Sequence, residues 1–322
     1  MTKPGELFIL SSQIEKPRSG MGFTAKHFQW IRLRYMKLLF KLIFMFTAVL
    51  GLDLPMAATA VPRGKVLVVM SGAHLLDLKE GKVYATGYYL NELYTPLAAL
   101  VEAGYTPVFA DPNGDTPSMD ASSNDAKFFG GDDVKRMEAL KFVDSFQELR
   151  HPLRLSSIVS HRNEFVGMFV PGGHAPMVDL VKDRDLGKIL SSFHDSGRPT
   201  ALICHGPMAL LSALPAAEKF NDALVSGDDH SLHALVKGWP YSGYRVAIFS
   251  KAEEQQIEAP QLDGHIQYYN DEAVAVAGAQ ISNAAPWQPN VVEDRELITG
   301  QQPFSDKAFA AAFISKLSAG AR

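Results

Sequence analysis

The sequence predicts a parallel α/β sandwich, in which helices cover a central sheet. Short apolar runs of strand length alternate along the chain with segments whose apolar residues recur at helical spacing. The runs are apolar throughout, which is typical of strands buried on both faces of a parallel sheet. At 322 residues, 47% hydrophobic and 20% charged, the chain can bury a full core and is neither fibrous nor disordered.

The first predicted unit is a strand, a helix and a second strand. KVLVVM at residues 65–70 and TPVFA at residues 106–110 are the strands. Between them, four leucines recur at helical spacing: Leu90, Leu93, Leu97 and Leu100. Pro96 lies inside this pattern, so we expect it either to begin the helix in its first turn or to kink it, because proline lacks the backbone donor.

The second half of the sheet follows the same logic. FVGMFV at residues 165–170 and TALI at residues 200–203 predict two more buried strands, with a helix over 186–193 between them. The remaining predicted elements are strands at 246–248 and 273–277, a hairpin that joins 291–292 to 297–298, and a closing helix over 306–317 with Ser305 as its N-cap. Together they predict one domain over residues 61–322.

Two segments interrupt this alternation. Residues 113–162 are rich in charges and helix formers, which indicates an insertion or a helical cap over one end of the sheet. Residues 219–243 are a second candidate insertion, rich in Asp, His and Gly. Ligands of open α/β sheets bind at the carboxyl ends of the strands, so both segments are candidates for the walls of the pocket.

The N-terminus is predicted to serve targeting. Residues 36–60 contain two lysines, an 11-residue apolar run and the small-x-small sequence Ala58-Thr59-Ala60, which are the three parts of a secretory signal peptide with cleavage before Val61. A spanning helix needs about 20 apolar residues, so the mature form is predicted to have no stable membrane span. We expect export to the periplasm or secretion, with an uncleaved membrane anchor as the alternative. Residues 1–60 then form a targeting region, and translation can start at Met1 or Met36.

Charge and cysteine content exclude several classes of function. Eight of the 31 Lys and Arg but only three of the 35 Asp and Glu lie in residues 1–60, which leaves a formal charge of −9 on the rest of the chain. An acidic body without a basic stripe argues against nucleic acid as the main partner. The single cysteine, Cys204, excludes an intramolecular disulfide and a thiolate-rich zinc site. His230 and His233 alone are too few ligands to predict a metal, so none is predicted.

Cys204 stands where an apolar strand runs directly into a predicted helix. The sequence Cys204-His205-Gly206-Pro207 places the thiol on a sharp turn, as in the nucleophile elbow of hydrolases. Amides at the start of the helix favour the thiolate. A free cysteine is more often packed as a small apolar residue, but the adjacent histidine and the Gly-Pro pair favour a nucleophile with its base.

Two further motifs can contribute to such a site. Gly172 and Gly173 follow a predicted strand, and a glycine turn lets backbone amides approach and stabilise an oxyanion. The next residue, His174, is interpreted as an ordinary loop histidine. Glu92 lies among apolar residues, where a raised pKa would let it share a proton with a thiol. A solvated glutamate at a helix start is the alternative, and the spacing does not choose between them.

Over residues 65–313 the sequence resembles the ThiJ/PfpI family of the class I glutamine amidotransferase-like superfamily. Five ordered blocks carry the resemblance: residues 87–96, 103–114, 171–174, 204–207 and 297–303. Residues 117–120 and the length of the chain are most similar to the branch of chaperones and glutathione-independent glyoxalases (glyoxalase III). The resemblance implies a flavodoxin-like sandwich with helices on both faces, a nucleophile elbow, no cofactor and a homodimer.

The resemblance also implies roles for particular residues. Cys204 matches the family's nucleophile, His205 its neighbouring base, and Glu92 the acid that hydrogen-bonds the thiol. The third acid of the triad stands in a Phe-(Ser/Thr)-x-x-x-Glu context, which favours Glu254, with Glu253 as the alternative. The last matching positions are those of the oxyanion turn: Gly172 and Gly173, joined by the amide of His205.

These roles imply a cofactor-independent cysteine enzyme that acts on small reactive 2-oxoaldehydes, converting methylglyoxal to lactate in a detoxification reaction. A holdase chaperone and a cysteine peptidase are the alternatives within the same family. A glutaminase subunit is the least supported, because amidotransferases of the superfamily carry a distant His-x-Glu, and none of His230, His233 and His265 is followed in that way.

Overall fold

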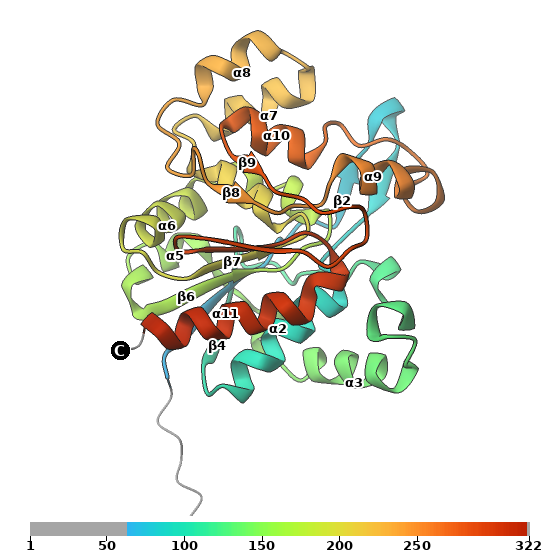
Figure 1. The fold of residues 1–322 in the computed structure, drawn as a ribbon, viewed down its shortest axis with the longest axis vertical. Helices are drawn as coiled ribbons and strands as arrows, with labels where there is room; N and C mark the ends of the chain where they lie inside the picture. The colour runs from blue at the N-terminus through green and yellow to red at the C-terminus, as the bar shows by residue number, and fades with distance from the viewer. Residues whose placement is uncertain (1–62, 321–322) are drawn as a thin grey trace, which may run out of the picture. The chain divides into compact units, whose positions relative to one another are not determined.

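The computed structural model describes residues 63–320, and these belong to one compact unit. Figure 1 shows the sheet at the centre with helices on both sides. The predictions for the targeting region 1–60 lie outside the described residues. Among the helices of the described part, none combines the length and the apolar character that a membrane crossing requires.

A seven-stranded sheet is the centre of the fold, in the order β10-β11-β7-β6-β1-β4-β5. Neighbouring strands are parallel, except that β10 runs antiparallel to β11. The strands, in sheet order, are β10 Val291–Asp294, β11 Leu297–Gly300, β7 Thr200–Ile203, β6 Phe165–Val170, β1 Lys65–Val69, β4 Thr106–Asp111 and β5 Leu153–Arg154. The predicted α/β fold with a mostly parallel sheet is confirmed, as is the predicted hairpin.

The sheet is buried on both faces, as its apolar strands require. Alternate residues of β1 point to opposite sides, so Leu67 and Val69 join one core cluster while Val66 and Val68 join the other. The helices α2 (Leu90–Glu102) and α11 (Asp306–Gly320) cover one face, and α6 (Arg184–Asp195) and η7 (Gly206–Ala213) pack in the cluster on the other. The carboxyl ends of β6 and β7 are therefore held between two packed layers.

Two details concern the ends and the interior of the predicted helices. Of the two predicted roles of Pro96, beginning the helix is wrong, because Pro96 is an interior residue of α2 and the Glu92 carbonyl lacks its intrahelical donor. Ser305 belongs to the short helix η9 (Pro303–Ser305) that precedes α11, and its hydroxyl accepts the amide of Asn290.

The prediction of a strand at 273–277 is wrong, because these residues belong to α10 (Asn270–Ala277). The alternation of Ala and Val is that of a strand, yet the buried positions Ala273, Val274 and Ala277 follow helical spacing. Gly278 ends the helix in the left-handed conformation with φ 114°. The predicted strand at 246–248 is not part of the seven-stranded sheet. Only the two residues of β8 (Arg245–Val246) form a strand there, and β8 pairs with β9 (Gln280–Ile281) in a separate sheet.

The two interrupting segments are largely helical. Residues 113–162 form the predicted cap, made of η2 Ala121–Ser123, η3 Ala126–Phe129, α3 Asp133–Asp144, α4 Gln147–Arg150 and α5 Leu155–Ile158, and they also supply the edge strand β5. Residues 219–243 lie mostly in α7 Ala217–Ser226 and α8 Asp229–Leu235. The other elements are β2 Leu75–Asp77, η1 Lys79–Gly81, β3 Val83–Ala85, η4 Arg162–Glu164, η5 Ala175–Met177, η6 Leu180–Lys182, α9 Lys251–Ile257 and the π-helical turn η8 Glu258–Leu262.

Candidate active site

Cys204 lies on a strained turn between β7 and η7. Its φ is +62°, a conformation that costs a residue with a side chain roughly 1–2 kcal/mol. Neighbouring backbone holds it there, because its amide donates to the Gly300 carbonyl at 2.8 Å and its carbonyl accepts the Phe249 amide at 3.0 Å. The thiol is only 2% exposed. This strand-to-helix geometry is that of a nucleophile elbow.

A hydrogen-bonded chain leads from the thiol to a buried acid. Cys204 Sγ lies 3.1 Å from His205 Nδ1, and His205 Nε2 lies 2.9 Å from Glu254 Oε2. A carboxylate only accepts hydrogen bonds, so Nε2 carries a proton and Nδ1 presents its lone pair to the thiol. Burial alone would raise the pKa of Glu254, but His174 and His205 outweigh it and lower this pKa to about 2. The acid is therefore ionised, and its hydrogen bond orients the His205 ring with Nδ1 towards the thiol.

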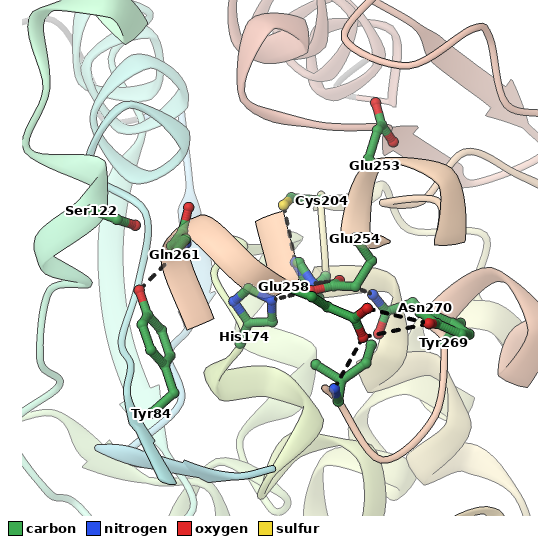
Figure 2. Close-up of polar contacts among 12 residues, drawn as sticks. Tyr84, Ser122, His174, Cys204, Glu253, Glu254, Glu258, Gln261, Tyr269 and Asn270 are labelled. Carbon is green, nitrogen blue, oxygen red and sulfur yellow. Dashed lines mark hydrogen bonds and ion pairs between the residues drawn. The ribbon is translucent and has the colours of Figure 1, made fainter. Parts of the chain in front are cut away.

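The side chains of the two neighbouring glutamates of α9 point in different directions (Figure 2). Glu254 points to the histidines, whereas Glu253 completes a capping box with Ser250 at the start of the helix. Glu253 also accepts the amide of Trp287 at 2.9 Å and the side-chain amide of Gln301. Of the two candidates for the third acid, the structure brings Glu254 to His205.

Glu92, in the first turn of α2, lies on the other side of the thiol. It is fully buried, and its carboxyl oxygens have no hydrogen-bond partner of ordinary geometry within residues 63–320. Burial raises the pKa of Glu92 to about 8, although the adjacent Cys204 thiol acts in the opposite direction. Burial and the neighbouring Glu92 in turn raise the pKa of the Cys204 thiol. At neutral pH the structure therefore favours a protonated Glu92 beside a protonated thiol.

The two glycines of the predicted oxyanion turn are required by close packing. A Cβ on Gly172 would lie 2.3 Å from Glu92 Oε2 and 2.4 Å from Cys204 Cβ. Gly173 has φ +92°, and its Cβ would lie 2.0 Å from the Gly87 carbonyl oxygen. The Gly173 amide faces the Cys204 sulfur, whereas the Gly172 amide faces Glu92. Of the two, Gly173 is the one that lines the cavity beside the thiol.

The thiol and His205 open onto a cavity of about 350 Å³. Its walls are mainly aromatic, with contributions from Tyr89, Phe128, Phe249, Trp287 and Phe304. Phe128 comes from the cap of residues 113–162, so this cap walls the pocket as predicted, together with Lys127 beside it. Residues 219–243 contribute no lining residue, and the expectation that they also wall this pocket is wrong.

The sequence analysis missed a second histidine of the site. His174, interpreted as a loop residue, is 1% exposed, and its Nε2 lies 2.7 Å from Glu254 Oε1 (Figure 2). Its ring centroid lies 4.1 Å from that of His205. A sequence signal for His174 exists, because it follows β6 directly and β6 lies next to β7, the strand that precedes Cys204. The carboxyl ends of neighbouring parallel strands lie at the same edge of a sheet, so His174 could be expected near the thiol.

The site's donor set does not match a preformed metal centre. The ligand atoms of His174, His205 and Glu254 all lie within 4.8 Å of one another. However, both histidine Nε2 atoms already donate to the carboxylate, so a metal ion would have to displace two hydrogen bonds. His230 and His233 belong to no cluster of three possible ligands in the described part of the chain.

A strained cysteine, a histidine and a buried acid lie together at the carboxyl end of a parallel sheet, which is the arrangement of an α/β protein with a candidate cysteine nucleophile. The family model described as ThiJ/PfpI family-like matches residues 84–239. A curated relative, the protein/nucleic acid deglycase HchA of Escherichia coli O157:H7, is 27% identical over 249 residues, which cover 76% of this chain and 77% of the relative. Protein/nucleic acid deglycase 1 of Escherichia coli K12 has the same identity and coverage.

Solved structures are also similar to this chain. The crystal structure of APC35852 matches with a TM-score of 0.60 and 26% identity, over 80% of this chain and 98% of that one. Glyoxalase III from Candida albicans shares the fold, with a TM-score of 0.59 and 20% identity over 79% and 98% of the two chains. The chain is therefore similar to the ThiJ/PfpI family and, at 27% identity, to deglycases of the HchA type.

Proposed function

We propose that this protein is a cofactor-independent enzyme that converts small 2-oxoaldehydes to 2-hydroxy acids, with methylglyoxal and lactate as the test pair. The observation that carries the proposal is the chain Cys204–His205–Glu254, which ends in a thiol at a cavity of about 350 Å³. The printed names of the curated relatives, protein/nucleic acid deglycases, support an enzymatic function for this chain.

The first step is attack by the Cys204 sulfur on the aldehyde carbon. His205 Nδ1, 3.1 Å from the sulfur, accepts the thiol proton as the bond from sulfur to carbon forms. The carbonyl electron pair moves to oxygen, which takes up a proton to give a hemithioacetal. The Gly173 amide, which faces the sulfur, is placed to stabilise the developing oxyanion.

The second step moves a hydrogen between neighbouring carbons. His205, neutral again, removes the proton from the former aldehyde carbon, and protonated Glu92 donates to the ketone oxygen, giving an enediol. His205 then returns its proton to the second carbon while the hydroxyl on the first carbon gives its proton to the Glu92 carboxylate, which yields a thioester of the 2-hydroxy acid and restores both side chains. Water then hydrolyses the thioester and frees the thiol. One carbon is oxidised as its neighbour is reduced, so the sequence needs no external oxidant or reductant.

Deglycation is a second candidate for the same site. At ~30 Å³ per water, the cavity has room for roughly ten water-sized groups, more than a three-carbon aldehyde fills. The extra space and the aromatic walls suit an aldehyde adduct on an amino-acid side chain. The relatives' printed name, protein/nucleic acid deglycase, supports this candidate.

The decisive test is lactate formation from methylglyoxal by the purified, reduced protein without glutathione or added metal. We expect Cys204→Ala to lose at least about 10³-fold in kcat/KM and Glu92→Gln about 10-fold to 100-fold. His230→Gln, on the exposed helix α8, is the matched control and should retain wild-type activity. A folded, reduced wild type without turnover would overturn the proposal and leave holdase and peptidase assays as the next tests.

The proposal extends to location and assembly. We propose that residues 36–60 direct export and are removed before Val61, which N-terminal sequencing of the mature protein tests. Recovery of residues before 61 in the exported protein would contradict cleavage there. We also propose a homodimer, and light scattering on the purified protein should give twice the mass of one chain.

A further inference from the structure

The acid of the candidate triad serves two histidines, not one. Glu254 Oε2 accepts from His205 Nε2 at 2.9 Å, and Oε1 accepts from His174 Nε2 at 2.7 Å. All three side chains are almost completely buried. The chain of contacts through His205 explains how a base is oriented, but it gives no reason for a second histidine on the same carboxylate.

We propose that His174 is a positioning residue that carries a proton at neutral pH, balances the charge of Glu254 and thereby keeps His205 neutral and Cys204 a thiol until a carbonyl substrate arrives. The effect on attack at a carbonyl substrate rests on the proposed function. The protonation states of His174, His205 and Cys204 do not rest on it, and they can be measured without turnover.

Geometry gives His174 a role that no other described residue fills. It is the only described donor to Glu254 Oε1, because Asn270 approaches Oε2, at 3.4 Å. Loss of His174 would leave one oxygen of a buried carboxylate without a partner, which is a costly state. The hydrogen bond therefore fixes the plane of the carboxylate and, through it, the His205 ring.

The charges around His174 favour its protonated form. Four titratable groups face it: Glu254 from α9, His205 from the elbow, Tyr84 from β3 and Asp120 from the cap. Burial alone would lower the pKa of His174, but Glu254 and Asp120 outweigh it and raise this pKa. Its Nδ1 has no hydrogen-bond partner in residues 63–320, so electrostatic attraction to the two acids is what holds the second proton.

A charged His174 keeps its neighbour uncharged. The two rings are 4.1 Å apart, so a second imidazolium at His205 would be repelled in a site with little water. Burial and the charge of His174 together lower the pKa of His205 to about 4. An imidazolium–thiolate pair, the resting state of many cysteine enzymes, is disfavoured here. The thiol then loses its proton only as it attacks the substrate.

The first test is alkylation of Cys204, the only cysteine, by iodoacetamide in the full-length protein from pH 5 to pH 10. Glutamine can still donate to Glu254 but cannot carry the charge, so His174→Gln is the informative variant. We expect its alkylation at pH 7 to be about tenfold faster than wild type, with an inflection about one pH unit lower. His230→Gln is the matched control. A His174→Gln profile that overlays the wild type and the control would overturn the proposal.

A second measurement needs no variant at the site. Nitrogen-15 spectra of the histidine-labelled wild type at pH 7 report the protonation of each ring. We expect one buried imidazolium, His174, and one buried neutral ring with its proton on Nε2, His205. A neutral His174 at pH 7 would refute the proposal even if the enzyme turns methylglyoxal over. Conversely, the expected spectrum would stand if methylglyoxal proved not to be a substrate.

Discussion

A histidine–glutamate pair lies near each of the two ends of the strands β7 and β11, and the two pairs have different surroundings. At the carboxyl end, His205 contacts Glu254 at 2.9 Å. At the amino end, His194 contacts Glu296 at 3.0 Å, next to the first residues of both strands. Distance and residue type are almost the same, so neither explains a difference in function.

The neighbours make the difference. Glu296 is stabilised by Tyr244, whose hydroxyl lies 3.0 Å from both of its carboxylate oxygens, and Arg295 stacks over the Tyr244 ring. This polar cluster joins α6 to the sheet. The carboxyl-end pair instead has a strained thiol 3.1 Å from the histidine and a cavity beside it. The comparison teaches that a histidine–acid pair becomes a candidate catalytic pair where a thiol and an open space lie beside it.

The largest expected effect comes from the same substitution at the two ends. Glu254→Gln removes the charge that orients His205, so we expect lactate formation to fall about 10³-fold to 10⁴-fold. Glu296→Gln breaks a structural cluster, so kcat/KM should stay within about twofold while the unfolding free energy falls by about 1–3 kcal/mol. Steady-state kinetics and urea unfolding of both variants check this. Equal losses of activity in the two variants would break the comparison.

The second expected effect is on stability, and it compares a glycine near the carboxyl ends of the strands with one near the amino ends. Gly173→Ala adds a Cβ 2.0 Å from the Gly87 carbonyl oxygen at φ +92°, so we expect a loss of about 3 kcal/mol or more of stability or failure to fold. Gly197, before the amino end of β7, has φ +61° and nothing within 4 Å of its Cβ, so Gly197→Ala should cost about 1 kcal/mol. Thermal unfolding monitored by circular dichroism compares them. A Gly173→Ala protein as stable as Gly197→Ala would contradict the packing argument.

The carboxyl end could be predicted from sequence because its signals are local. Cys204 and His205 are adjacent, and the glycine turn directly follows an apolar strand. The choice of Glu254 over Glu253 also has a local signal in the sequence. Ser250-x-x-Glu253 is a capping-box pattern, which commits Glu253 to the helix start and leaves the next residue free.

Other features depend on contacts that sequence spacing does not record. His174 meets its acid across 80 positions of the chain, because the fold places α9 beside the loop that follows β6. The strand predicted at 273–277 failed for a related reason. Its alternation is compatible with either structure, and tertiary packing of Ala273, Val274 and Ala277 selected the helix. The cluster of His194, Glu296 and Tyr244 at the amino ends of β7 and β11 was not predicted from the sequence.

The last expected effect is a dependence of stability on pH, and it contrasts two buried glutamates, Glu92 without hydrogen-bond partners in residues 63–320 and Glu296 with several. Burial raises the pKa of Glu92 to about 8, above its value in the unfolded chain. Its contribution to stability is therefore fully present below about pH 4.5 and is lost as the pH rises towards 8, by an amount on the order of a few kcal/mol. Glu92→Gln, which stays neutral, should be more stable than wild type at pH 8 and nearly equal to it at pH 4.5.

For Glu296→Gln we expect the opposite change in unfolding free energy under the same conditions, because the substitution removes a carboxylate oxygen that accepts hydrogen bonds from Tyr244 and His194. It should be less stable than wild type at pH 8. Urea unfolding of the three proteins at pH 4.5, 6 and 8 measures both effects. If Glu92→Gln and wild type lost stability in parallel between pH 4.5 and 8, Glu92 would be ionised in the folded protein. It could not then donate the proton that the proposed enediol step requires, and His205 would be the only proton carrier left beside the thiol.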